Sequence, residues 1–359
     1  MVSAVLFITF FVLLVLNVPI AVCLGLSSAA AILYSGTSLT IVATNIYSGI
    51  SKFLLLAIPF FVLSGNIMAK AGISTRLIRF VDTCVGHRKG GIANVCIIVA
   101  CFFGAISGSG PATVAALGAV LIPAMVERGG FSAAFSTALM ATSSSIAIVI
   151  PPSIAFVVYA SITGVSIGDM FMAGIIPGIL MGLALVVVVM LEVRRNHVVP
   201  SNVEKASAKE RWNAFKDAFW GFLMPIIILG GIYGGFFTPT EAAAVSVVYG
   251  LFVGMVIYKE VKFKDLWEIL IDSAKTTGGI MLIVACASLF SFVCTRFGIS
   301  TAASELLARV ASNQFTFLLI CNIIFLIAGC FIDANSAMYI FIPIMLPVCK
   351  ALVYNVIAF

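Results

Sequence analysis

Charged side chains are scarce in this chain: only 9% of its 359 residues are Asp, Glu, Lys or Arg, whereas 62% are hydrophobic. A soluble globular domain carries about 25% charged residues, so this chain cannot cover a water-facing surface of its own size. The scarcity excludes a soluble enzyme, a disordered chain and a coiled coil. Because the apolar runs are far longer than the roughly 9–11 residues of a barrel strand, the composition predicts an all-α polytopic membrane protein.

Signatures of catalysis and of metal binding are also missing from the sequence. The nine cysteines include no Cys-x-x-Cys pair, and His87 and His197 lie beside arginines in polar segments, so neither a disulfide framework nor a zinc site is indicated. No Gly-x-x-x-x-Gly-Lys-Ser/Thr loop is present, so the chain does not itself hydrolyse nucleotides. We therefore expect no enzyme activity, and we interpret the net charge of +6 as loops beside apolar spans rather than a nucleic-acid interface.

Long apolar segments are the main feature that is present. They cover residues 2–18, 19–35, 53–69, 91–107, 111–126, 131–163, 168–193, 220–236, 240–258, 276–295 and 315–349. Several are long enough to cross about 30 Å of hydrocarbon at 1.5 Å per residue. The pair 91–107 and 111–126 is short and meets at a Gly/Pro break, which predicts a re-entrant helical hairpin over 91–126. Two thin crossing helices joined by a surface turn are the alternative.

The two halves of the chain repeat a pattern at a nearly constant offset. Pro19 matches Pro239 at an offset of 220, and Gly72–Thr75 recurs as Gly298–Thr301 at an offset of 226. Two further matches, Lys52 with Lys275 and residues 121–123 with 345–347, have offsets of 223 and 224. Such ordered matches predict a structural repeat.

The predicted repeats are 1–193 and 220–359, separated by a polar linker at 194–219. The first comprises scaffold helices within 1–69, the hairpin 91–126, a broken helix at 131–163 and a span at 168–193; the second has its hairpin at 315–349. The break of the first broken helix lies at Pro151 and Pro152. With the repeat offset of about 225 residues, the matching break would lie near residue 376. We therefore expect that the second repeat lacks its last two spans here.

The count of crossings predicts the topology. If the hairpin does not cross, the first half crosses five times, so the repeats are inverted. Segments 70–90 and 194–216 are basic, which predicts that both are cytoplasmic and that the N-terminus lies outside.

The helix breaks are the predicted sites, because an interrupted helix exposes carbonyl oxygens at one end and N–H groups at the next. The first hairpin tip and the broken helix offer oxygens suited to a cation such as Na⁺ and N–H groups suited to a carboxylate. At these breaks the candidates are Ser107, Gly108, Ser109, Gly110, Thr113, Thr142, Ser143, Ser144, Ser145, Ile150, Pro151, Pro152 and Ser153. Helix–helix packing by small residues is the alternative for the serines.

The second hairpin has its break near Asp333, Asn335 and Ser336. A charged side chain at mid-membrane costs about 2.5–3.5 kcal/mol on insertion scales, so it usually marks a pathway or an ion site. Glu241, which follows Thr238 and Pro239, is instead predicted to cap a helix start.

Several motifs together resemble the large membrane subunit of tripartite ATP-independent periplasmic (TRAP) transporters, within the ion-transporter superfamily. They are Ala57–Phe61, Phe102–Ser109 with Ala112–Thr113, Ile150–Ser153, Ala173–Gly178 and Phe237–Ala242. The resemblance spans the whole chain.

This resemblance implies an elevator-type secondary importer in the bacterial inner membrane, with its N-terminus periplasmic. It implies Na⁺-coupled uptake of an organic acid such as a C4-dicarboxylate or sialic acid, together with a small four-helix membrane subunit and a periplasmic binding protein. The implied Na⁺ ligands are Ser107, Gly108, Ser109, Ile150 and Pro151 in one site and Gly329 and Asp333 in a partial second site. The residues expected to contact the substrate are Gly110, Thr113, Ser145, Ser153, Asn335 and Ser336.

Two positions depart from the family pattern. A glycine usually precedes the Pro-Pro pair by four residues, and here that position is Ala147, whose methyl would crowd the site; a second Pro-Pro-type break is absent. A stand-alone Na⁺/dicarboxylate carrier of the same superfamily and a non-transporting membrane scaffold or remnant are the alternative functions.

Overall fold

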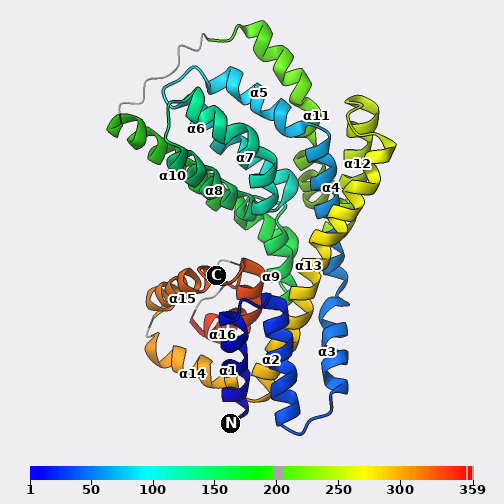
Figure 1. Cartoon of the computed structure of the whole chain (residues 1–359), viewed down its shortest axis with the longest axis vertical. Helices are drawn as coiled ribbons and strands as arrows, with labels where there is room; N and C mark the ends of the chain where they lie inside the picture. The colour runs from blue at the N-terminus through cyan, green and yellow to red at the C-terminus, as the bar shows by residue number, and fades with distance from the viewer. Residues whose placement is uncertain (197–204, 312, 353–354, 358–359) are drawn as a thin grey trace. The chain divides into compact units, whose positions relative to one another are not determined.

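The computed structural model describes residues 1–196, 205–311, 313–352 and 355–357, and in these ranges it contains helices and no strand (Figure 1). The prediction of an all-α chain is confirmed. The first half contains α1 (Val2–Val15), α2 (Ile20–Tyr34), α3 (Thr40–Ile50), the 3₁₀ turn η1 (Phe53–Leu56), α4 (Ala57–Lys70), α5 (Ile73–Val85), α6 (Gly91–Ser107), α7 (Gly110–Glu127), α8 (Ala133–Val149), α9 (Ile154–Thr163) and α10 (Ile167–Arg195). The second half contains α11 (Ala208–Tyr233), α12 (Pro239–Phe252), the π-helical turn η2 (Val253–Ile257), α13 (Phe263–Arg296), α14 (Ile299–Val310), α15 (Gln314–Gly329) and α16 (Ala334–Leu352).

The helices form two compact units, each built from separate stretches of chain. Unit 1 comprises residues 1–55, 158–166 and 275–359, and unit 2 comprises residues 56–157 and 167–274. Each unit combines parts of both predicted repeats, so the inverted repeat stays a prediction. The first predicted hairpin belongs to unit 2 and the second to unit 1.

In unit 2, α8 is packed against the first hairpin and against α10. It packs against α6, α7 and α10, while α4 packs against α12 and α5 packs against both α6 and α11. Phe61, Phe103 and Phe171 are among the largest side chains that are fully buried in this core. The first hairpin and α8, the first arm of the broken helix, are therefore packed together within one unit.

In unit 1, α1 packs against α2, and α16 packs against α14 and α15. Phe290 of α13 contacts Phe7 and Phe10 of α1, with ring centroids 6.2 and 5.7 Å apart. The amino-terminal helix and a helix almost 300 residues later thus share one aromatic cluster.

Seven helices in the described residues are long and apolar enough to cross a membrane, and the bent pair α8 and α9 adds an eighth if it counts as one span. Much of their apolar surface is exposed: on α10, Ile176, Leu180 and Leu191 are each more than half exposed. Such a surface suits lipid rather than water. The protein is a multi-pass membrane protein.

Three elements differ from the sequence-based boundaries. Helices α1 and α2 have 14 and 15 residues, which at 1.5 Å per residue is shorter than the hydrocarbon layer of about 30 Å. The five-crossing count and the outside N-terminus therefore stay predictions. The uncharged stretch 36–51, which lies between two of the predicted apolar segments, contains helix α3.

The predicted linker 194–219 is also shorter than expected. Helix α10 continues to Arg195, and α11 begins at Ala208 because Ser207 and Glu210 form a capping box. The charged residues after 207 therefore lie on helical turns that extend a span, and residues 197–204, including His197, lie outside the described residues. Glu241 forms the same box with Thr238 at the start of α12, so its predicted capping role is confirmed.

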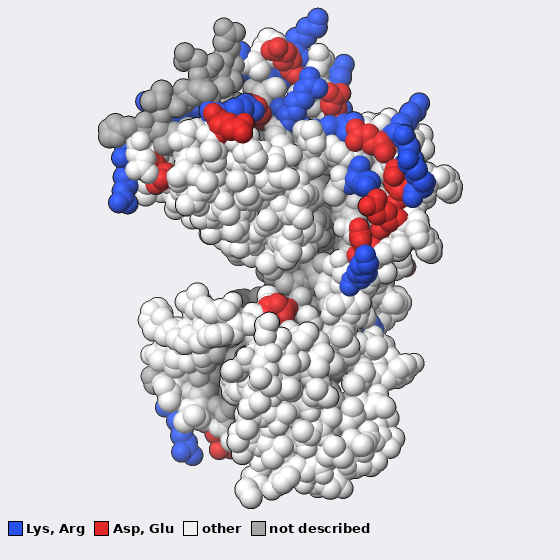
Figure 2. Space-filling model, in the orientation of Figure 1, with Lys and Arg blue, Asp and Glu red and all other residues white. Residues whose placement is uncertain are grey.

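Charged side chains of unit 2 gather at the end that carries α5 and the start of α11 (Figure 2). Helix α5 buries Ile73, Leu77 and Val81 on one face, at intervals of four residues, and presents Arg76 and Arg79 on another. The sequence predicted this stretch only as a basic cytoplasmic segment.

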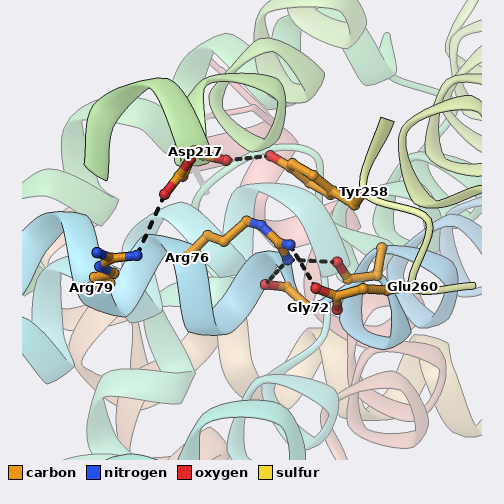
Figure 3. A network of polar contacts seen from close by, with 7 residues as sticks. Gly72, Arg76, Arg79, Asp217, Tyr258 and Glu260 are labelled. Atoms are coloured by element: carbon orange, nitrogen blue, oxygen red, sulfur yellow. Dashed lines mark hydrogen bonds and ion pairs between the residues drawn. The ribbon is translucent and has the colours of Figure 1, made fainter. Parts of the chain in front are cut away.

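Arg76 is the centre of a polar network that ties α5 to its neighbours (Figure 3). Its guanidinium donates to the carbonyls of Ala71 and Gly72 at 3.1 and 3.0 Å and to Glu260 Oε1 at 2.6 Å. It also lies 3.9 Å from the ring centroid of Tyr258. The short chain between η2 and α13 is thereby held against the corner between α4 and α5.

Tyr258 extends this network to α11. Its hydroxyl donates to the carbonyl of Asp217 at 2.5 Å, and burial is the main cause that raises the pKa of Tyr258 to about 12. The phenol therefore keeps its proton, and its hydrogen bond, throughout the neutral range.

Candidate functional site

The first hairpin turns at a glycine in the left-handed conformation. Helix α6 ends at Ser107, and Gly108 follows with φ +60°, donating its N–H to Gly104 O at 2.8 Å. Helix α7 starts at Gly110 with Pro111 in its first turn, a position where the missing N–H costs nothing. The break is therefore only two residues long, at 108–109.

The second break, between α8 and α9, lies against this tip. Helix α8 ends at Val149, the chain bends by 45°, and α9 begins at Ile154. The N–H of Ile154 donates to the carbonyl of Gly108 at 3.3 Å. A methyl group at Gly108 would lie 2.7 Å from Pro152 O, so only glycine fits here. The structure thus brings Ser107–Ser109 and Ile150–Ser153 together, as the cation hypothesis requires.

Hydroxyl groups line the hairpin tip. Ser107 Oγ and Thr113 Oγ1 are 3.1 Å apart, and Thr113 Oγ1 donates to Ser109 O at 2.8 Å. The side chains of Ser107, Thr113 and Ser153 are buried, and Ser153 Oγ donates to Ile148 O at 2.5 Å. Ser145, predicted to contact substrate, is exposed on α8.

Backbone oxygens at the second break have no helical partner. Among the described residues, the carbonyls of Ile150, Pro151 and Pro152 accept no backbone hydrogen bond, because Ile154 turns its N–H to Gly108 and two prolines have none. Hard cations are bound by neutral or charged oxygen ligands of this kind. Within the same residues no cluster of three or more His, Cys, Asp or Glu could hold a metal ion, so carbonyls and hydroxyls are the ligands on offer.

Ala147 does not crowd the site as the family pattern suggested. It is fully buried, and its methyl group faces Gly104 of α6, where an added Cβ would lie 2.7 Å away. The small residue on α6 makes room for the larger one on α8, and the two helices approach closely at this point.

Two glycines of α10, Gly174 and Gly178, lie against the second break. The sequence did not predict them as site residues. A methyl at Gly174 would lie 2.4 Å from Val149 O, and one at Gly178 would lie 2.4 Å from Ile150 Cγ1. Two glycines four residues apart let backbones approach in membranes. This spacing within Ala173–Gly178 was the signal that could have found them.

The second predicted site, in unit 1, is organised differently. Asp333 caps α16: one carboxylate oxygen accepts from the N–H groups of Asn335 and Ser336 at 3.0 and 3.3 Å, and the other accepts from the Ser336 hydroxyl. The structure therefore brings Asp333, Asn335 and Ser336 together. Gly329, at the end of α15, is exposed, and a methyl added there would meet nothing within 4 Å.

The all-helical fold, its lipid-suited surface and its contacting helix breaks define a multi-pass α-helical membrane protein of the transport type. Residues 7–359 match the family model described as "Tripartite ATP-independent periplasmic transporter, DctM component". The chain belongs to this family of transporter permeases, as its motifs indicated.

Named relatives agree with this assignment. The chain is 38% identical over 352 residues to the C4-dicarboxylate TRAP transporter large permease protein DctM of Rhodobacter capsulatus, covering 94% of this chain and 79% of the relative. It is 41% identical over 330 residues to DctM of Pseudomonas aeruginosa, covering 92% and 77%. It is 36% identical over 338 residues to the 2,3-diketo-L-gulonate TRAP transporter large permease protein YiaN of Escherichia coli, covering 92% and 79%.

Proposed function

We propose that this chain is the large permease of a Na⁺-coupled importer of a small organic acid in the bacterial inner membrane. It would work with a small four-helix membrane subunit and a periplasmic binding protein. The observation that carries the proposal is the contact between Gly108 and the break at Pro151–Pro152, which leaves carbonyl oxygens of the break without backbone partners. The names of the relatives, which specify C4-dicarboxylate and a diketo sugar acid, support a carboxylate as substrate.

Na⁺ is the coupling ion that this donor set favours. Its ligands would be backbone carbonyls of Ile150 and Pro151 and the backbone and hydroxyl oxygens of Ser107–Ser109, all of them neutral. The N-termini of α7 and α9 would face the substrate carboxylate, because helix N-termini favour anions. A membrane potential supplies about 2.3 kcal/mol per charge per 100 mV, so each co-transported Na⁺ adds a substantial driving force.

Uptake in proteoliposomes tests the proposal. The chain would be reconstituted with the small subunit and the binding protein, and radiolabelled succinate would be the probe. We expect uptake with an inward Na⁺ gradient and none when choline replaces Na⁺. Equal flux in choline would contradict Na⁺ coupling, and uptake by the large subunit alone would indicate a stand-alone carrier.

A matched pair of variants locates the ion site. Thr113→Val removes a buried hydroxyl that bonds to two proposed Na⁺ ligands, Ser107 Oγ and Ser109 O. Thr137→Val removes an exposed hydroxyl on α8 that bonds only within its helix. We expect the Na⁺ concentration for half-maximal uptake to rise several-fold in the first variant and to stay unchanged in the second. The same Na⁺ response in both would remove the tip from the site.

A further inference from the structure

A basic hollow lies at the charged end of unit 2, away from the helix breaks. It has a volume of about 430 Å³ and is formed by the end of α5, the first turns of α6 and the last turns of α10. Three cations line it: Arg88, Lys89 and Arg194. None of the lining residues belongs to the predicted ion or substrate sites.

Gly90 holds the cations in place. It adopts φ +70°, and a methyl group there would lie 3.0 Å from both Val189 and Val193 of α10. The loop after α5 therefore packs directly on α10. Because the Gly91 N–H also donates to Arg88 O at 2.7 Å, Arg88 and Lys89 are fixed beside the end of the helix that carries Arg194.

The positive charge of the hollow is uncompensated. In the described ranges, no ion pair joins Arg88, Lys89 or Arg194 to an acid, whereas Asp82 of α5 pairs with Arg128 at 2.9 Å. The N-terminus of α6 at Gly91 adds the positive end of a helix dipole. Like charges held together in this way attract an anion.

Apart from Asn94 of α6, the rest of the lining is apolar. Val186, Met190 and Val193 follow one another at helical spacing on α10, and Ile98 of α6 also lines the hollow. Met190 is 53% exposed although it is hydrophobic. A cationic rim above an apolar wall fits an anionic headgroup joined to a hydrocarbon chain, and it fits a free anion less well.

We propose that this hollow binds an anionic phospholipid. Its phosphodiester would lie among Arg88, Lys89 and Arg194, and one acyl chain would run along Val186, Met190 and Val193. The site is independent of substrate transport, and its ligand comes from the surrounding bilayer.

Native mass spectrometry of the purified chain tests the proposal. The protein would be equilibrated in micelles with equal amounts of phosphatidylglycerol and phosphatidylcholine. We expect the wild-type chain to retain phosphatidylglycerol selectively. In the triple variant Arg88→Gln/Lys89→Gln/Arg194→Gln, the affinity for phosphatidylglycerol should fall roughly fivefold for each cation removed. Lys205→Gln/Lys209→Gln/Lys264→Gln, which removes three exposed lysines outside the hollow, should retain the lipid. Equal retention by both triple variants would overturn the proposal.

Two further experiments distinguish a bound lipid from a misfolded variant and from a bound free anion. Met190→Trp fills the apolar wall and leaves the cations intact; we expect loss of phosphatidylglycerol, and unchanged retention would overturn the proposal even if the triple variant fails to fold. Millimolar inorganic phosphate should not displace the lipid. Complete displacement would assign the hollow to a free anion instead.

Discussion

Gly108 joins two helix breaks through backbone atoms alone. Its carbonyl accepts from Ile154 N–H, its N–H donates to Gly104 O, and its missing side chain leaves room for Pro152 O. Two requirements therefore coincide at this residue, a left-handed φ and a close backbone approach. Either one would favour glycine, and the second depends on a partner 44 residues away.

The two requirements can be separated by comparison with Gly36, which has φ +73° and nothing within 4 Å of an added methyl. Gly108→Ala and Gly36→Ala share a backbone strain of about 1–2 kcal/mol, but only the first also collides with Pro152 O. We expect Gly108→Ala to lower the melting temperature in detergent by several degrees more, and to abolish Na⁺-driven uptake. Equal melting temperatures would mean that the contact does not constrain the site.

Asp333 has a structural role that the sequence did not predict. The sequence placed a carboxylate near mid-membrane and so predicted a pathway or ion site, but the carboxylate caps α16 through the backbone of Asn335 and Ser336. A cation bound by Asp333 would have to share these oxygens with the helix. Its part in a second Na⁺ site stays a prediction.

Helix α5 is held at one turn much more firmly than at the next. Arg76 is 24% exposed and makes three kinds of contact, whereas Arg79, one turn later, is 69% exposed and meets Asp217 only at 3.5 Å. An exposed pair contributes about 0–1 kcal/mol. The stability of this corner should therefore depend on Arg76.

Neutralising each arginine tests this difference within one helix. Arg76→Gln leaves Glu260 and two backbone carbonyls without their donor, so we expect a loss of about 1–3 kcal/mol, whereas Arg79→Gln should change stability by less than about 1 kcal/mol. Thermal unfolding in detergent measures both. Indistinguishable unfolding curves would show that the network around Arg76 does not hold the corner.

Local chemistry explains which elements could be predicted from the sequence. The breaks at 107–111 and 150–153 were predictable because Gly and Pro act on their own backbone, and the start of α12 because Thr238 and Glu241 cap it locally. The close approach of Gly174 and Gly178 to the second break was not, because it depends on a helix packed from elsewhere in the chain. Helix α3 was missed because it is only 11 residues long and mixes polar with apolar residues, so it is too short and too polar to resemble a membrane span.

At the scale of the whole molecule, the apolar surface defines the environment. Helix α10 has 29 residues and exposes Leu180 near its middle and Leu191 near its end, 59% and 58% respectively. In water this would be an aggregation-prone surface. In a bilayer it is the lipid face of a span.

The assignment of α10 to a membrane span can be tested by placing a charge at two different depths along the helix. Leu180→Arg places a charge near the centre of the span, where insertion scales assign about 2.5–3.5 kcal/mol, whereas Leu191→Arg places it close to Arg194 and Arg195 at the end. We expect the first variant to reduce the inserted fraction in a microsomal insertion assay and the second to leave it nearly unchanged. Equal insertion of the two would contradict the assignment of Leu180 to the lipid face.

The interleaving of the two units has a consequence for biosynthesis. The chain passes from one unit to the other four times, at 55/56, 157/158, 166/167 and 274/275. All of unit 2 has been synthesised by residue 274, while the aromatic cluster of Phe7 and Phe10 cannot close until Phe290 has been added. No single cut of the gene yields either unit in one piece, and α1, which meets α2 as soon as both are made, completes its aromatic contacts only after α13 has been synthesised.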